Sequence, residues 1–159
     1  MAAATFKTDG LVVHECGDVC LAIWTGPTDS ARLRLLSAAI DAIANRNGGS
    51  LVVCQFVDPT SRPPDAEARA EIVTMLKRKG RLRRFITVPL GDAFWIGVVR
   101  SIMRAFFVLV RRSEMLVIAD DERSAVKSIL AAKSARTPSA ANLSEAIAEL
   151  LRDAGRAPR

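Results

Sequence analysis

Four short apolar runs, each followed by a segment with helical spacing, restrict the fold of this chain more than any other feature. The runs are Val19–Trp24, Leu51–Val57, Phe85–Val88 and Met115–Ala119. Each has the length of a strand, and Leu51–Val57 is apolar apart from Gln55, as in a strand covered on both faces. Because strands that alternate with helices form a largely parallel sheet with helical cover, we predict an α/β fold.

The segment from Lys7 to Trp24 predicts an opening β-hairpin. Its two apolar runs, Leu11–Val13 and Val19–Trp24, are separated by polar residues and by Gly17-Asp18. We therefore expect a mostly parallel sheet of about five strands that opens with an antiparallel hairpin, with helices packed on it. The 159 residues have room for one such core, which at this size needs no disulfides or metal.

Polar capping residues mark where the predicted helices begin. The residues expected at the N-caps are Thr28 or Asp29, Asp65, Asp92 and Asp120. Beyond Lys133 the chain becomes rich in Ser, Ala, Thr and Pro, which is typical of a linker. We therefore expect a domain over 7–131, a linker over 132–141 and a C-terminal helix over 142–155.

The C-terminal helix is predicted from Asn142 and Glu145, which have the spacing of a capping box. Leu143, Ile147 and Leu150 then form an apolar stripe on one side of the helix. The pattern leaves open whether this stripe packs on its own domain or on a partner.

The sequence is poor in groups that carry catalysis. It contains one histidine and no tyrosine, and it has no glycine-rich phosphate loop and no nucleophile elbow. His14, Cys16 and Cys20 do not make the four-ligand set of a structural zinc site. We expect no metal, no cofactor and no enzymatic activity. The few cysteines, in or beside apolar runs, indicate a reducing cytoplasm.

Several aspartates follow predicted strands, at the edge of a parallel sheet where ligands collect. They are Asp58, Asp92 and the pair Asp120-Asp121. One interpretation is that they gather Mg²⁺. The interpretation we favour is that these residues cap helices.

A localised basic run follows the second predicted helix. Between Arg69 and Arg84 the charge sums to +6, which equals the net charge of the whole chain. Nucleic acid, anionic lipid and an acidic partner are the alternatives to a solvated helix end, which we favour. Because no motif that reads a nucleic-acid groove is present, we expect no nucleic-acid partner. The basic run consists of Lys77, Arg78, Lys79, Arg81, Arg83 and Arg84.

The longest apolar stretch, 93–110, predicts a helix that is apolar around most of its circumference. Small and basic residues occupy only one narrow stripe of this helix, which includes Arg100 and Arg104. Each arginine would cost about 2.5–3.5 kcal/mol near the centre of a bilayer, so we do not expect a transmembrane segment. The apolar residues that we expect to make contacts are Phe94, Trp95, Val98, Ile102, Phe106 and Leu109.

So wide an apolar surface needs more cover than one sheet face supplies. The candidates for this cover are another subunit, the C-terminal helix and a lipid-like ligand. Ordinary packing against neighbouring helices of the same domain is the alternative.

The segment Phe94–Met103, with its Arg-Ser step, is followed by a short strand and by Asp120–Val126. This order resembles the SpoIIAA-like branch of the STAS fold over roughly residues 7–131. The resemblance implies a non-enzymatic regulatory or ligand-binding module of the bacterial cytoplasm.

In the anti-sigma-factor antagonists that the chain resembles, a partner kinase phosphorylates a Ser or Thr after a central strand. The corresponding stretch here is Val57–Pro63, which lacks their Asp-Ser-x-Gly pattern and is rich in proline. Thr60 and Ser61 are the candidate phosphate acceptors.

These observations lead to two functional expectations. The first is a protein-interaction module of STAS-like fold that associates with itself through the helix 93–110. The alternative is a carrier or sensor of a small lipophilic or anionic ligand, in which Arg100 or Arg104 holds the head group.

Overall fold

The computed structural model describes residues 3–78, 80–112 and 114–157. Its strands are β1 (Ala3–Thr8), β2 (Leu11–Cys16), β3 (Val19–Trp24), β4 (Leu51–Val57), β5 (Leu82–Pro89) and β6 (Leu116–Ile118). Its helices are α1 (Ser30–Arg46), α2 (Ala66–Lys77), α3 (Ala93–Val110), α4 (Glu122–Ala131) and α5 (Ala140–Asp153).

The strands form one sheet in the order β1-β2-β3-β4-β5-β6. The first three are joined as an antiparallel meander, and β3, β4, β5 and β6 are parallel neighbours. In the parallel part, Gln55 of β4 lies between Ala22 of β3 and Thr87 of β5. The predicted α/β class, the mostly parallel sheet and the opening hairpin are confirmed.

The additional strand is β1, which the sequence did not predict. It pairs antiparallel with β2, with Phe6 opposite Val13 and Thr8 opposite Leu11. Its sequence, Ala-Ala-Thr-Phe-Lys-Thr, has no run of large apolar residues. It forms because β2 offers a free edge.

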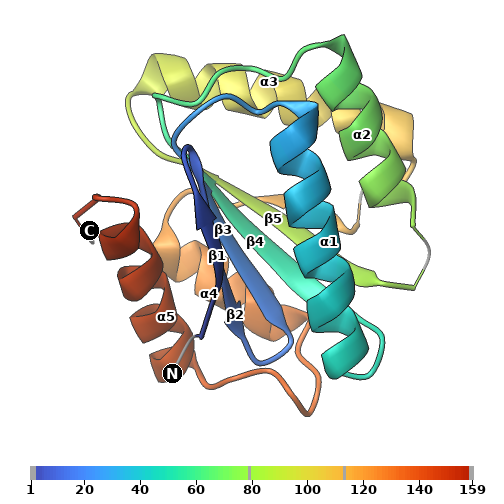
Figure 1. Cartoon of the computed structure of the whole chain (residues 1–159), viewed down its shortest axis with the longest axis vertical. Coiled ribbons are helices and arrows are strands. Elements are labelled where there is room, and N and C mark those ends of the chain that lie inside the picture. The colour runs from blue at the N-terminus through green and yellow to red at the C-terminus, as the bar shows by residue number, and fades with distance from the viewer. Residues whose placement is uncertain (1–2, 79, 113, 158–159) are drawn as a thin grey trace.

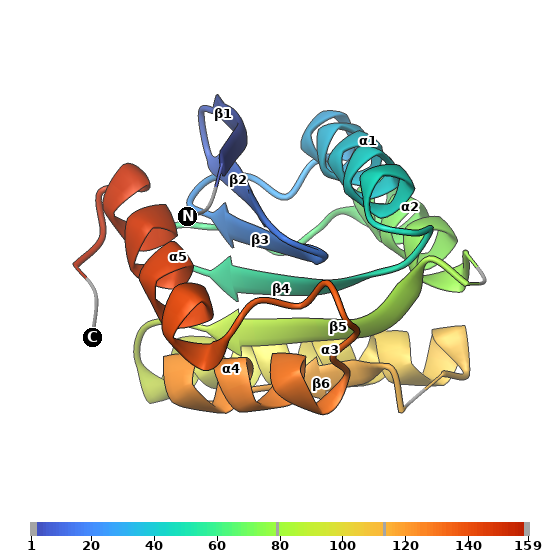
Figure 2. The same cartoon turned by 90° about the horizontal axis from the view of Figure 1, so that it is seen from below.

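Helices cover both faces of the sheet (Figures 1 and 2). Residues of α1, α2 and α3 share one core with Val53 and Phe85. Residues of α4 and α5 share a second core with Cys54 and Ile86. Successive residues of a strand point to opposite faces, so β4 and β5 contribute to both cores. In Figure 1, α5 and α1 lie on opposite sides of the strands.

Side-chain caps fix where the helices begin. Asp29, Asp65 and Asp92 each accept a hydrogen bond from the backbone N–H three residues later, as predicted. Two expected caps were wrong by a few residues. Asp121, not Asp120, caps α4, because the Asp120 carboxylate binds Arg100 instead.

The helix α5 starts before its predicted position. Ser139, not Asn142, is its cap and accepts a hydrogen bond from Asn142 N at 3.2 Å. The linker is therefore shorter than 132–141, and the helix ends at Asp153. Leu143, Ile147 and Leu150 are completely buried against β2, β3 and α4. The C-terminal helix packs on its own domain and leaves the outer side of α3 uncovered.

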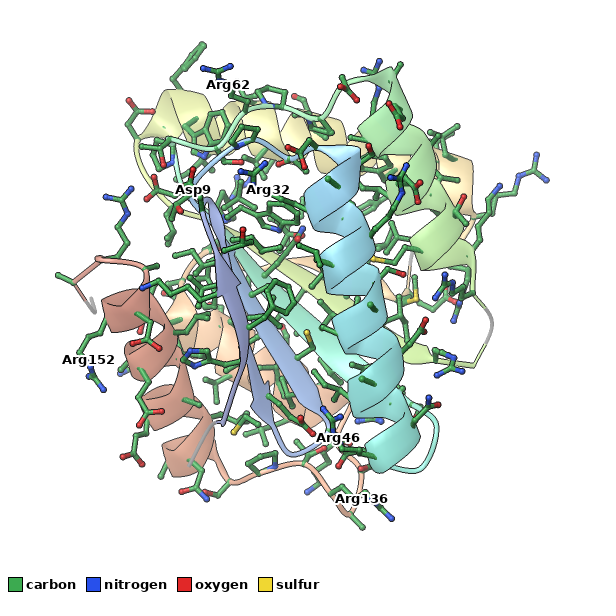
Figure 3. The ribbon with its side chains drawn as sticks, viewed as in Figure 1. Asp9, Arg32, Arg46, Arg62, Arg136 and Arg152 are labelled. Atoms are coloured by element: carbon green, nitrogen blue, oxygen red, sulfur yellow. The ribbon has the colours of Figure 1, made fainter. Side chains whose placement is uncertain are left out.

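The linker is held by Asp18, a completely buried carboxylate in the turn between β2 and β3. Its oxygens accept hydrogen bonds from Ser134 Oγ at 2.5 Å, Thr137 Oγ1 at 2.8 Å and Arg83 Nη2 at 2.5 Å. Figure 3 shows Arg136 of the linker beside Arg46, whose backbone oxygen accepts from Arg136 Nη1 at 2.9 Å. These contacts direct the chain around the sheet edge to α5.

Candidate functional site

The aspartates at the carboxyl edge of the sheet each have a partner within the chain. Asp92 and Asp121 are caps, and Asp120 binds Arg100. Asp58 is buried and does not cap a helix; its Oδ1 accepts from Arg156 Nη2 at 2.8 Å. Among the described residues, no group of three or more His, Cys, Asp or Glu side chains could hold a metal ion.

His14 and Cys20 lie on opposite faces of the sheet and do not meet at one site. Cys20 belongs to the core under α1, and Cys16 belongs to the core under α5. His14 Nε2 lies 2.8 Å from Asp153 Oδ2 of α5, and the ring is almost fully buried. Burial raises the pKa of the Cys20 thiol to about 12. The histidine therefore anchors the C-terminal helix.

All four guanidinium groups of the basic run bind other parts of the chain. Arg78 and Arg81 donate to Asp41 and Asn45 of α1, at 2.7 and 2.9 Å respectively. Arg83 binds Asp18, and Arg84 Nη1 donates to the backbone oxygen of Ser128 at 3.0 Å. Lys77 is exposed. Lys79 lies outside the described residues. The run therefore joins the start of β5 to its neighbours.

The two candidate phosphate acceptors differ in accessibility. Ser61 is 4% exposed, and its Oγ lies 3.2 Å from Thr28 Oγ1. Thr60 is exposed, but its hydroxyl oxygen lies 2.6 Å from Asp58 Oδ1. A phosphate at Thr60 would therefore sit beside the Asp58 carboxylate, which would repel it, and beside Arg156 Nη2, which lies 3.4 Å from the hydroxyl oxygen and would attract it.

The apolar residues of α3 divide between two sides of the helix. Phe94 is 79% exposed and Leu109 54% exposed, so both point away from the sheet. Phe106 is 3% exposed and packs in the core. We had expected it on the outer surface, and this prediction is wrong. Trp95, Val98 and Ile102 are half-buried. Val108, which was not among the predicted contact residues, is also exposed on this helix, at 77%.

Small side chains run along the exposed side of α3. A shallow groove there is lined by Ala93, Phe94, Gly97, Val98, Ser101 and Ile102. A Cβ atom built on Gly97 would meet no atom within 4 Å. We call the exposed side the outer face of α3, and it consists of Ala93, Phe94, Gly97, Ser101, Arg104, Ala105, Val108 and Leu109.

By length and composition, α3 is the one helix in the described part of the chain that could cross a membrane. Val99, Met103 and Phe106 nevertheless join it to the core over the sheet. The helix is also the crossover between the parallel strands β5 and β6. That it does not span a membrane stays a prediction.

A cavity of about 60 Å³ lies on the inner side of α3, between that helix, α2 and the sheet. Neither Arg100 nor Arg104 lines it. Its polar lining residues are Thr28, Gln55, Ser61, Arg62 and Thr87. The Oε1 atom of Gln55 accepts from Trp24 Nε1 at 3.0 Å. Gln55 Nε2 donates to Thr87 Oγ1 at 3.0 Å. The apolar walls include Val57, Ile72, Phe85, Trp95, Val99, Ile102 and Met103.

Comparison with known proteins gives no match: no family model, no curated protein and no solved structure matches this chain. Inferences about function therefore depend on the outer face of α3 and on the cavity.

Proposed function

We propose that this chain is a non-enzymatic regulatory protein-interaction module that associates with a second copy of itself through the outer face of α3. The proposal depends on one observation: two large exposed side chains, Phe94 and Val108, and two small ones, Gly97 and Ala105, are placed symmetrically along this face. Large apolar side chains exposed in a contiguous patch are typical of interaction surfaces.

The order is symmetric about Ser101. Phe94 and Val108 lie seven residues on either side of Ser101, and Gly97 and Ala105 lie four residues on either side. A two-fold interface places the same patch of each subunit against the other. An antiparallel pair of α3 helices centred on Ser101 would therefore bring Phe94 of one copy to Val108 of the second. Gly97 would lie opposite Ala105 between them, and Arg104 would lie opposite Val98.

The charges at the ends of α3 suit the same antiparallel arrangement. Asp92 precedes the helix, Arg111 follows it, and both are exposed. In a pair centred on Ser101, Arg111 of one copy lies within one residue of the register position of Asp92 of the second. Opposite charges placed in this way favour the antiparallel over the parallel pairing.

The proposed relation to the SpoIIAA-like branch of the STAS fold is supported by the order of elements. An opening hairpin is followed by alternating helices and parallel strands, and then by a closing helix. The proposed cytoplasmic location is supported by Cys16, Cys20 and Cys54, which are buried free thiols.

The proposal is tested by disulfide trapping at the symmetry point. In Ser101→Cys, the two new thiols face each other across the two-fold axis, and we expect rapid formation of a disulfide-linked dimer under mild oxidation. In Ala105→Cys, the thiols of an antiparallel pair are separated by about 12 Å along the helix axes, so we expect no such dimer. A parallel pair would link both variants.

Light scattering after size-exclusion chromatography supplies the second measurement. We expect the unmodified chain to be dimeric and Phe94→Glu to be monomeric, because a carboxylate would be buried in the interface. Leu35→Glu is the matched control, since Leu35 is an exposed apolar residue of α1, and it should remain dimeric. A monomeric unmodified chain, together with Ser101→Cys that links no faster than Leu35→Cys, would overturn the proposal.

A further inference from the structure

The cavity between the sheet, α2 and α3 has largely apolar walls, and the amide of Gln55 is held in a fixed orientation among them. The orientation of the Gln55 amide is fixed by its neighbours, because an indole N–H can only donate and must therefore face the amide oxygen. With Oε1 toward Trp24, Nε2 faces Thr87. The two contacts hold the amide in one position.

This amide retains hydrogen-bonding capacity. The nitrogen of a primary amide carries two hydrogens. One of them is directed to Thr87 Oγ1, and within the described part of the chain the second has no acceptor. Gln55 is half-buried, whereas Thr87 beneath it is completely buried. The second N–H of Gln55 is therefore a donor that faces the cavity without an acceptor. Of the other polar lining residues, Thr28 and Ser61 contact each other through their hydroxyl groups and Arg62 is exposed at the rim.

The cavity also has a route to the surface. Part of its lining comes from the loop after β4, where Arg62 and Pro63 are exposed. Figure 3 shows the Arg62 side chain pointing outward at the rim of the molecule. This loop is fixed against the start of α3, because a Cβ at Gly91 (φ +113) would lie 2.3 Å from Pro59 Cγ. The rim at Arg62 and Pro63 is therefore where the lining of the cavity reaches the surface.

We propose that the cavity binds a small neutral molecule with an apolar body and one carbonyl oxygen, which accepts a hydrogen bond from Gln55. A cavity needs about 10–15 Å³ to hold one water molecule. The volume of about 60 Å³ therefore accommodates a molecule with the size of roughly four waters. A short-chain ketone has this size. An ion would lose its hydration among the apolar walls, and the charged residue of the lining, Arg62, is exposed at the rim.

The composition of the chain makes the test selective. Gln55 is the only glutamine, and Trp24 and Trp95, the only tryptophans, both line the cavity. Chain labelled with ¹⁵N in the glutamine side chain and in the indoles therefore reports on this site alone in nuclear magnetic resonance spectra. The probes are butanone and 2-methyl-1-butene, in which a methylene group replaces the oxygen.

We expect butanone to shift the Gln55 amide signals and both indole signals in a saturable way, with a dissociation constant in the millimolar range. The alkene should bind roughly five- to tenfold more weakly, because one hydrogen bond is missing. Gln55→Leu should remove this preference without weakening the binding of the alkene. If Gln55→Leu does not fold, Gln55→Met serves the same purpose with a longer and more flexible apolar side chain.

Val99→Phe, which fills the cavity from α3, is the control for the site and should abolish the shifts. Three results would overturn the proposal. They are the absence of saturable shifts with butanone, equal affinity for the ketone and the alkene in the unmodified chain, and undiminished binding in Val99→Phe. If butanone only displaced water from the cavity, the signal shifts would not saturate, which is the first of these results.

Discussion

At the residue scale, the Asp18 carboxylate shows how a buried charge is held by hydrogen bonds within the chain. Asp18 is completely buried at the point where the linker crosses the sheet edge. Burial raises the pKa of a carboxyl, but hydrogen bonds from Ser134, Thr137 and Arg83 outweigh this effect, and the pKa of Asp18 lies below its usual value. The ionised carboxylate therefore stabilises the folded chain.

Replacement of Asp18 by Asn keeps the shape of the side chain and removes its charge. We expect Asp18→Asn to lower the free energy of unfolding by about 3 kcal/mol at pH 7, because Arg83 loses its ionic partner. Urea denaturation followed by tryptophan fluorescence measures this change. An unchanged unfolding midpoint would contradict the assigned role.

The pH dependence of the same variant has a defined sign. Because the folded pKa is below the unfolded value of about 3.9, the contribution of Asp18 is present above that value and is lost as the pH falls through the folded pKa. The difference in stability between the unmodified chain and Asp18→Asn should therefore narrow as the pH falls below about 4. Repeating the urea series across that range, with both chains under the same conditions, checks the expectation.

At the element scale, α3 and α5 have similar spacing of apolar residues but differ in how much of their apolar surface is buried. Both helices carry apolar residues at three- and four-residue spacing. The stripe of α5 is narrow and is buried on its own sheet, whereas α3 is apolar on its outer face as well. From the width of the apolar arc we predicted a second contact surface on α3, and the exposed outer face is the one we propose. The width did not indicate which side faces the sheet.

The docking of α5 can be tested by truncating one buried side chain. Ile147 is completely buried in the core that α5 shares with β2 and β3. We expect Ile147→Ala to lower the free energy of unfolding by about 3 kcal/mol, through lost burial and a cavity. Ser144→Ala, on the exposed side of the same helix, should change it by less than about 0.5 kcal/mol. Equal stabilities of these two variants would show that α5 does not pack on this sheet.

At the scale of the whole molecule, one sheet serves two cores. Cys20 lies in the core under α1, α2 and α3, and Cys54 lies in the core under α4 and α5. Neither thiol is accessible to solvent, and burial raises the pKa of each. Because β4 and β5 contribute to both cores, we expect the two layers to unfold together.

Thiol labelling measures this cooperativity. Two variants are compared, one with Cys16 and Cys20 replaced by Ala and the other with Cys16 and Cys54 replaced by Ala. We expect the remaining thiol to react with a disulfide reagent at the same slow rate in both variants, since each exposure requires global unfolding. Labelling of Cys54 more than tenfold faster than of Cys20 would show instead that the layer of α4 and α5 opens separately.

The sequence alone determined the α/β class, the opening hairpin and the sites of several helix caps, because these depend on local spacing and on residues next to each other in the chain. It also identified Gln55 as the one polar residue of an apolar strand and α3 as the helix with excess apolar surface. Only the tertiary structure decided that Phe106 faces inward while Val108 faces outward, and that most of the basic run binds within the chain. It also decided that Gln55 lies in a cavity between Trp24 and Thr87. These features depend on contacts between residues distant in the sequence, which periodicity and composition do not specify.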